Sequence, residues 1–152
     1  MRPLVAALAA SLALLLSFAL AAGVTLEVRG PWIREAPPAA SVLAAYMIIH
    51  NEGDSPAEIT SITSPEFDHT ELHRTMVESG VARMVPVEKL QIPAGSEISL
   101  EPGGMHLMLF NPRRSLREGD SVTLVIHRAD GFCNTYTIPV IRAAADAGHQ
   151  HP

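Results

Sequence analysis

Short β-type runs that alternate with turn-forming clusters constrain the fold of this chain more than any other feature. Runs rich in Val, Ile, Leu and Thr are separated by Gly, Pro, Asn and Asp, as in Asn51 to Pro56 and Glu101 to Gly104. No window beyond the apolar N-terminus has a convincing helical period. This spacing predicts an all-β domain, either a Greek-key β-sandwich or a barrel. The expected strands are Val24 to Val28, Val42 to His50, Ala57 to Thr63, Phe67 to Val77, Val81 to Val87, Glu97 to Leu100, Met105 to Phe110, Ser121 to His127 and Thr135 to Ile141.

The N-terminus has the features of a secretory signal. Leu4 to Leu20 is almost unbroken apolar sequence, led by Arg2 and ended by an Ala-Leu-Ala site that favours cleavage after Ala21. The run is slightly short for a bilayer core, which disfavours a spanning helix. No cysteine follows the cleavage site, so lipid anchoring there is not expected. We predict a signal peptide over 1–21, one domain over 22–142 and a flexible, His-containing tail over 143–152.

The acidic balance of the chain excludes several kinds of partner. It has 11 basic and 16 acidic side chains, and loss of Arg2 with the signal changes the formal net charge from −5 to −6. We therefore expect no nucleic-acid binding and no stable membrane insertion after signal cleavage. The single cysteine, Cys133, cannot form an internal disulfide and is expected to be buried and inert.

A histidine and a methionine occupy alternate positions of one predicted strand. Side chains alternate across a strand, so His106 and Met108 face one way, whereas Leu107 and Leu109 face the other. The leucines make one face apolar core. The other face then presents a nitrogen and a sulfur donor.

A second such pair lies on a predicted hairpin with Ser79-Gly80 at its tip. With a two-residue loop, Thr75 lies opposite Met84, and His73 becomes a diagonal neighbour of Met84 on the same face. A three-residue loop would move Met84 to the other face. That other face is expected to pack on the core through Leu72, Met76, Val81, Val85 and Val87.

Together, the two pairs would form a soft and electrically neutral donor set. Two imidazoles and two thioethers suit Cu(I), and Ag(I) for the same reason, whereas zinc prefers thiolate, imidazole and carboxylate ligands, and calcium prefers oxygen. Thioethers also hold Cu(I) without forming disulfides and release it to a stronger thiolate. These are the properties that a metal carrier needs.

The spacing of these four residues resembles the signature of the PCuAC family of periplasmic copper chaperones. Ten residues separate His73 from Met84, twenty-one separate Met84 from His106, and one separates His106 from Met108. The stretches "PWIREAPP", "AAYMIIHNEGD" and "MVPVEKLQIPAGSEISLEPGGMHLML" are also similar to that family.

The resemblance implies a cupredoxin-like β-sandwich in the periplasm that carries copper and is not an enzyme. Its implied Cu(I) ligands are His73, Met84, His106 and Met108. The implied acceptor is the CuA subunit of cytochrome c oxidase, sometimes with a Sco-type thiol-disulfide protein as a further partner. Some family members also have a His- or Met-rich tail for Cu(II).

The remaining candidate donors have simpler interpretations. Met76 and Met105 lie beside the four ligands in sequence and are either accessory thioethers or core residues, and strand parity favours the core. The tail offers His149 and His151 without a methionine, so weak capture of Cu(II) and a merely solvated tail both stay open. Three isolated histidines are expected to be surface or capping residues: His50, His69 and His127.

Three other functions compete with copper delivery. Copper buffering or resistance needs the same site but no dedicated acceptor. A secreted interaction module would carry the four residues by accident and would scatter them in space. An electron-transfer cupredoxin needs His and Met soon after its cysteine, and "CNTYTIPVIR" from Cys133 has neither. No hydrolase, zinc-protease or phosphate-loop motif indicates an enzyme.

Overall fold

The computed structural model describes residues 23–142, and this range contains strands but no helix, so no helix in it could span a membrane. The all-β class is confirmed. Every predicted strand except the first agrees with an observed strand to within two residues at either end. The strands are β1 (Leu26–Arg34), β2 (Val42–Asn51), β3 (Ala57–Thr63), β4 (Phe67–Glu78), β5 (Val81–Pro86), β6 (Leu90–Ile92), β7 (Glu97–Leu100), β8 (Met105–Pro112), β9 (Ser121–Arg128) and β10 (Cys133–Ile141).

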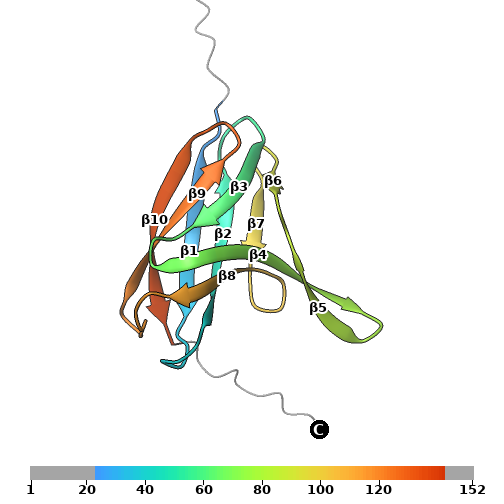
Figure 1. The fold of residues 1–152 in the computed structure, drawn as a ribbon. Coiled ribbons are helices and arrows are strands. Elements are labelled where there is room, and N and C mark those ends of the chain that lie inside the picture. Colours follow the sequence, from blue (N-terminus) through green and yellow to red (C-terminus); the bar gives the residue numbers. More distant parts are fainter. Residues whose placement is uncertain (1–22, 143–152) are drawn as a thin grey trace, which may run out of the picture.

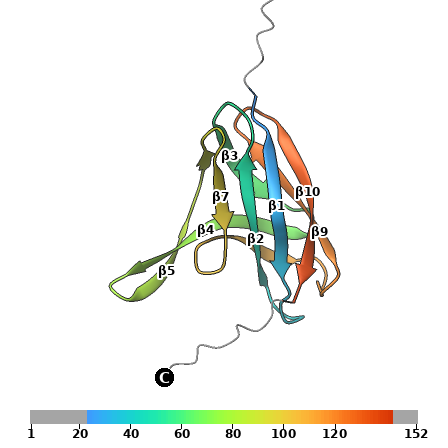
Figure 2. The ribbon, with the colours of Figure 1, turned by 180° about the vertical axis from the view of Figure 1, so that it is seen from behind.

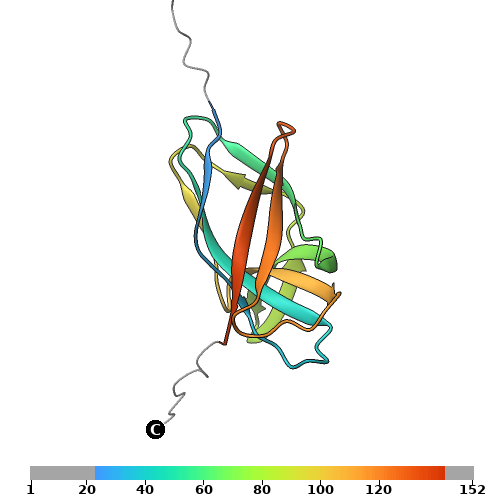
Figure 3. The ribbon, with the colours of Figure 1, turned by 90° about the vertical axis from the view of Figure 1, so that its left-hand side faces the viewer.

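The strands form one sheet that folds over on itself. Their order is β5-β4-β8-β7-β2-β1-β10-β9-β3-β6, with β8 also paired to β2 and with β1 parallel to β10. Figure 1 shows β4 and β8 running across the long strands β1 and β10, and the first half of β2 pairs with β8. Figure 3 shows β9 (orange) beside β10 (red), with which it pairs. Thr70 of β4 donates a hydrogen bond to the carbonyl oxygen of Ile62 in β3, which joins the two halves of the sheet.

One hydrophobic core fills the space inside the folded sheet. Alternate side chains of β8 point into it, and Leu107 and Leu109 are almost fully buried there beside Ile49 of β2 and Leu124 of β9. Because these inward positions have the spacing of two that a strand requires, the next positions along β8 must face outward. The core therefore fixes the direction in which His106 and Met108 point.

Strand β1 extends further than predicted, because the dipeptide Gly30-Pro31, which is typical of a turn, forms a bulge inside the strand. Gly30 has a positive φ of 53°, and the pairing of β1 with β2 shifts between Arg29 and Trp32. A glycine adopts this conformation without steric cost, and a bulge lets the strand continue past a proline. The prediction ended the strand at Val28, so it missed the half of β1 that lies nearest the candidate site.

The hairpin of β4 and β5 is an arm that projects from the sandwich (Figures 1 and 2). The prediction that one of its faces packs on the core is wrong for most of its length, because Met76, Val81 and Val85 are 53%, 57% and 41% exposed. The pairing of β4 with β8 ends at Arg74 and Met105, so no strand lies beside the outer part. Only Leu72 packs against the core, while Val87 is half-buried.

Cys133 is exposed at the first position of β10. The expectation of a buried thiol is therefore wrong. The residue opens β10 and pairs with His127 of β9, whereas β1 pairs with β10 only at its other end, at Val140 and Ile141.

The buried amide of Asn51 holds the far end of β2 to the neighbouring loops. Asn51 is fully buried, and its Nδ2 donates to the carbonyl oxygens of Ser55 at 2.7 Å and Ile92 at 3.1 Å. Its Oδ1 accepts a hydrogen bond from the Gly53 amide at 3.1 Å. The bond to Ile92 is buried and the other two are partly buried, so the amide satisfies backbone groups that water reaches poorly.

Replacement of this amide should destabilise the whole domain. We expect Asn51→Ala to lower the free energy of unfolding by roughly 3 kcal/mol, because buried backbone groups lose their partner. Chemical denaturation measures the change. In the matched control Gln91→Ala, which removes an exposed amide hydrogen bond to Glu58, the change should stay within about 0.5 kcal/mol. Equal stability of both variants would contradict the role given to Asn51.

Candidate metal site

The turn of the arm fixes which way Met84 points. Ser79 and Gly80 have φ of 50° and 79°, as in a two-residue turn of type I′. Glu78 pairs with Val81, and Thr75 pairs with Met84. The predicted register is therefore confirmed, and Met84 lies on the same face of the arm as His73.

The pairing of β4 with β8 brings the two His/Met pairs together. His73 lies directly opposite His106, and Glu71 lies opposite Met108. The two imidazole ring centroids are 6.3 Å apart, with an angle of 64° between the rings. All four residues predicted as ligands thus lie on one face of the adjacent strands β5, β4 and β8. Their role as copper ligands stays a prediction.

Exposure to solvent differs strongly among the four side chains. His106 is only 6% exposed and the His73 side chain only 14%, whereas Met84 is 60% exposed and Met108 is half-buried. The candidate site is therefore open to solvent only at its methionine side. A ligand could enter or leave past the arm with little movement of the histidines.

A hollow with a volume of about 600 Å³ lies beside three of the four residues. Met84, His106 and Met108 line it, together with residues of β1, β2 and the loop before β8. His73 is outside the lining and reaches the site through its contact with His106. The hollow is wide enough for part of another molecule to approach the donors.

The hydrogen bonds of the two histidines leave one ring nitrogen free in each. His73 Nε2 lies 2.8 Å from Glu71 Oε2, while its Nδ1 is buried and has no hydrogen-bond partner among the described residues. His106 Nδ1 lies 3.1 Å from the carbonyl oxygen of Gly104. Because both partners are acceptors, each of these nitrogens carries the proton. The lone pairs of His73 Nδ1 and His106 Nε2 remain for a metal ion.

Glu71 is a residue of this site that the sequence reasoning missed. It stands two positions before His73 in β4, so the alternation that placed His73 also places Glu71 on the same face. A carboxylate that holds the far nitrogen of an imidazole orients the ring and makes it a better metal ligand. Strand parity together with this pattern could have identified it.

The two further methionines differ from each other. Met105 is 8% exposed and belongs to the core, as predicted. Met76 pairs with Arg83 on the face of the arm opposite to Met84, and it is exposed instead of buried. Neither thioether lies on the face that carries the four predicted ligands.

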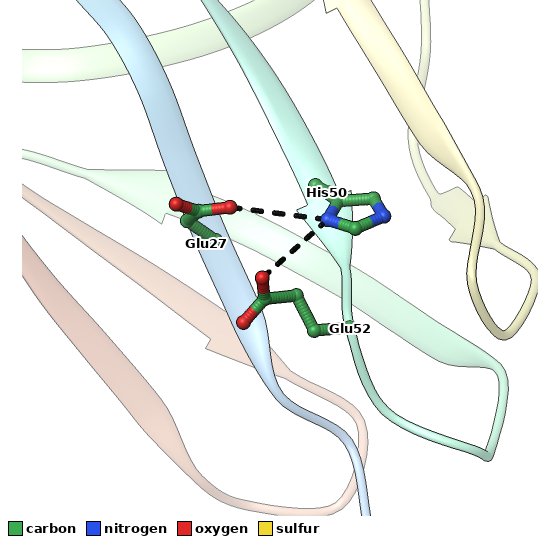
Figure 4. A group of neighbouring side chains, drawn as sticks. All are labelled: Glu27, His50 and Glu52. Carbon is green, nitrogen blue, oxygen red and sulfur yellow. Dashed lines mark ion pairs between the residues drawn. The ribbon is translucent and has the colours of Figure 1, made fainter.

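A separate cluster of possible metal ligands consists of Glu27, His50 and Glu52 (Figure 4). Arg29 occupies this cluster, because its Nε donates to Glu27 at 2.6 Å and its Nη2 lies 2.9 Å from His50 Nδ1. The group is thus an ion-pair network at the surface. Glu97, at 3.4 Å from Arg29, completes it.

The other isolated histidines also make ordinary surface contacts. His69 stacks on Phe110 with 4.4 Å between ring centroids, and His127 Nε2 lies 2.8 Å from the Thr63 hydroxyl. The surface interpretation of these residues is confirmed. His149 and His151 of the predicted tail, like the predicted signal peptide, lie outside the described residues.

Comparison with solved structures defines the class of this domain. The copper-bound PCuAC domain from PmoF2 superposes with a TM-score of 0.65 at 18% identity, over 80% of this chain and 97% of that one. The apo form of DR1885 from Deinococcus radiodurans gives 0.61 at 30% identity, over 82% and 83% of the two chains. Its CuI form gives 0.58 at 26% identity. The fold is therefore the cupredoxin-like fold of PCuAC domains.

Comparison of sequences places the chain in a family. The family model "Putative lipoprotein LpqE-like" matches residues 26–140, so the chain belongs to the LpqE-like family. "Putative lipoprotein Lxx21020" of Leifsonia xyli is 29% identical over 115 residues, which are 75% of this chain and 68% of that protein. "Uncharacterized protein RP573" of Rickettsia prowazekii is 28% identical over 104 residues, and the match spans 56% of its length.

The tautomers assigned here are testable without metal. In long-range ¹H–¹⁵N spectra of the apo protein, His73 should carry its proton on Nε2 and His106 on Nδ1. Glu71→Ala should remove the preference of His73 and leave that of His106 unchanged. Glu78→Ala, a carboxylate change near the tip of the same strand, serves as the control. If His73 kept its tautomer without Glu71, the orienting role of that carboxylate would be wrong.

Proposed function

We propose that this protein is an exported copper metallochaperone that binds one Cu(I) ion through His73, Met84, His106 and Met108. The observation that carries the proposal is the register of β5, β4 and β8, which gathers two imidazoles and two thioethers on one face. Such neutral, soft donors suit a monovalent soft ion. The similar structures include a copper-bound PCuAC domain and CuI-DR1885, and this similarity supports the same cargo.

The gradient of exposure suggests the order of events in copper transfer. The buried histidines, with Glu71 behind His73, form the fixed part of the site, whereas Met84 on the arm forms the exchangeable part. A thiolate of an acceptor displaces the Met84 thioether first, because a thioether binds Cu(I) more weakly than a thiolate and Met84 is the most accessible of the four ligands. The ion then leaves through successive ligand exchange, and no covalent bond of the protein changes. The protein is a carrier and not an enzyme.

The proposed location and partners follow from the family and the predicted signal. We propose that the protein is located in the periplasm. The description "putative lipoprotein", given to the family and to the relative from Leifsonia xyli, also suggests export. The proposed acceptor is the CuA subunit of cytochrome c oxidase, with a Sco-type thiol-disulfide protein as a second partner. We also propose weak capture of Cu(II) by the tail, which a Cu(II) titration tests.

Met84 and Met76 provide a matched pair for testing the site. Both are exposed methionines on the same arm, but only Met84 is on the His73 face. In a Cu(I) titration against a competing chelator, Met84→Leu should lower the affinity at least about tenfold, since loss of a ligand costs no less than loss of an outer-shell group. Met76→Leu should leave it unchanged. Equal affinities of the wild type and a His106→Ala, Met108→Ala double variant would reject the site altogether.

Deletion of the gene separates delivery from buffering. If the protein delivers copper, the deletion strain should lose cytochrome c oxidase activity when copper is scarce, and added copper should restore it. If the protein buffers copper, the strain should instead grow poorly only under copper excess. Normal oxidase activity under copper limitation would contradict the delivery role. A strain carrying Met76→Leu is the matched control, and one carrying Met84→Leu should behave like the deletion.

A further inference from the structure

The hollow beside His106 and Met108 contains a cation that has no anionic partner among the described residues. This cation is Arg34, the only arginine or lysine of the described part of the chain that lines the hollow. The guanidinium carbon lies 5.9 Å from the ring centroids of both Trp32 and Tyr46. Its Nε is buried and has no hydrogen-bond partner among residues 23–142, and none of the ion pairs within this range involves it.

The sheet register places Arg34 beside the candidate copper site. Ile33 pairs with Ala45, so Arg34 is on the face that Ala44 also occupies, and Ala44 pairs with Met108. Two strand spacings separate the backbones of Arg34 and Met108, roughly 10 Å. The intervening side chain is only a methyl group. Open space therefore lies between the guanidinium and the thioether.

The one carboxylate in the lining of the hollow does not neutralise Arg34. Glu35 accepts a hydrogen bond from Arg142 Nε at 3.0 Å. This bond lowers the pKa of the Glu35 carboxyl group, so Glu35 stays ionised and paired with Arg142. Arg34 is left with two aromatic rings, which hold the guanidinium in place by cation–π attraction but do not compensate its charge.

We propose that Arg34 binds a carboxylate side chain of the protein that receives copper. This inference deepens the proposed function and rests on it. Arg34 lines the hollow, and the terminal nitrogens of its planar guanidinium can donate two parallel hydrogen bonds to a carboxylate that enters there. The occupant is a segment of the acceptor in which an Asp or Glu lies next to the cysteines that take the ion. The bound carboxylate positions those cysteines over Met84 and Met108.

Two synthetic peptides provide the probe. Both contain the same pair of cysteines, and they differ only in one neighbouring residue, which is Glu in one and Gln in the other. Transfer of Cu(I) from the loaded protein is followed anaerobically by the ultraviolet absorption of the Cu(I)–thiolate product, in wild type and in Arg34→Gln. Arg83→Gln is the matched control. Arg83 is an exposed arginine on the face of the arm opposite to Met84, and it forms no ion pair among the described residues.

The wild type should transfer copper to the Glu peptide about fivefold faster than to the Gln peptide at low ionic strength. The ratio should fall to one in Arg34→Gln and in high salt, and should persist in Arg83→Gln. The chelator-measured affinity for Cu(I) should be the same in all three proteins. A ratio of one in the wild type, or an unchanged ratio in Arg34→Gln, would overturn the role of Arg34 while leaving the copper site intact. Failure of the wild type to load Cu(I) would overturn the proposed function and this inference together.

Discussion

The pairing of β4 with β8 is the interaction on which the rest of the site depends. This pairing sets His73 opposite His106. On the inner face, Leu72 pairs with Leu107 and packs against the core. At the end of the pairing, the Thr75 amide donates a hydrogen bond to the carbonyl oxygen of Gly104. A slip of one residue would turn one histidine into the core and one leucine outward. The slipped register is unfavourable because it would bury an imidazole without hydrogen-bond partners. The hydrophobic contacts that stabilise the sandwich therefore also bring the four donors together.

The site combines a fixed part with an accessible part. His106 is buried and His73 is partly buried, and hydrogen bonds to Gly104 and Glu71 determine which ring nitrogen of each stays free. Met84 is carried on an arm that no second layer covers. A buried set of four ligands would hold the ion but hinder its release, whereas a fully exposed set would bind weakly. The arrangement observed here suits an ion that has to be held and then passed on, with Arg34 beside the route.

The parts of this structure that sequence reasoning could predict are those governed by local rules. Strand parity placed His106 and Met108 together, and the Ser79-Gly80 turn placed Met84 with His73, because both depend only on alternation and loop length. The exposure of Met76 and Cys133, the burial of His106 and the contact of Glu71 with His73 depend instead on which strands have neighbours. The bulge at Gly30 was not predicted, because a glycine followed by a proline usually indicates a turn. That the two pairs meet was implied by the family resemblance, and the pairing of β4 with β8 supplies its geometry.

X-ray absorption at the copper edge of the Cu(I)-loaded protein reports the atoms around the ion and so tests the four-ligand site itself. Two nitrogen and two thioether sulfur neighbours are expected in the wild type. One sulfur should be lost in Met84→Leu and none in Cys133→Ser. A shell made only of nitrogen and oxygen, or a sulfur signal that disappears with Cys133, would contradict the four-ligand site.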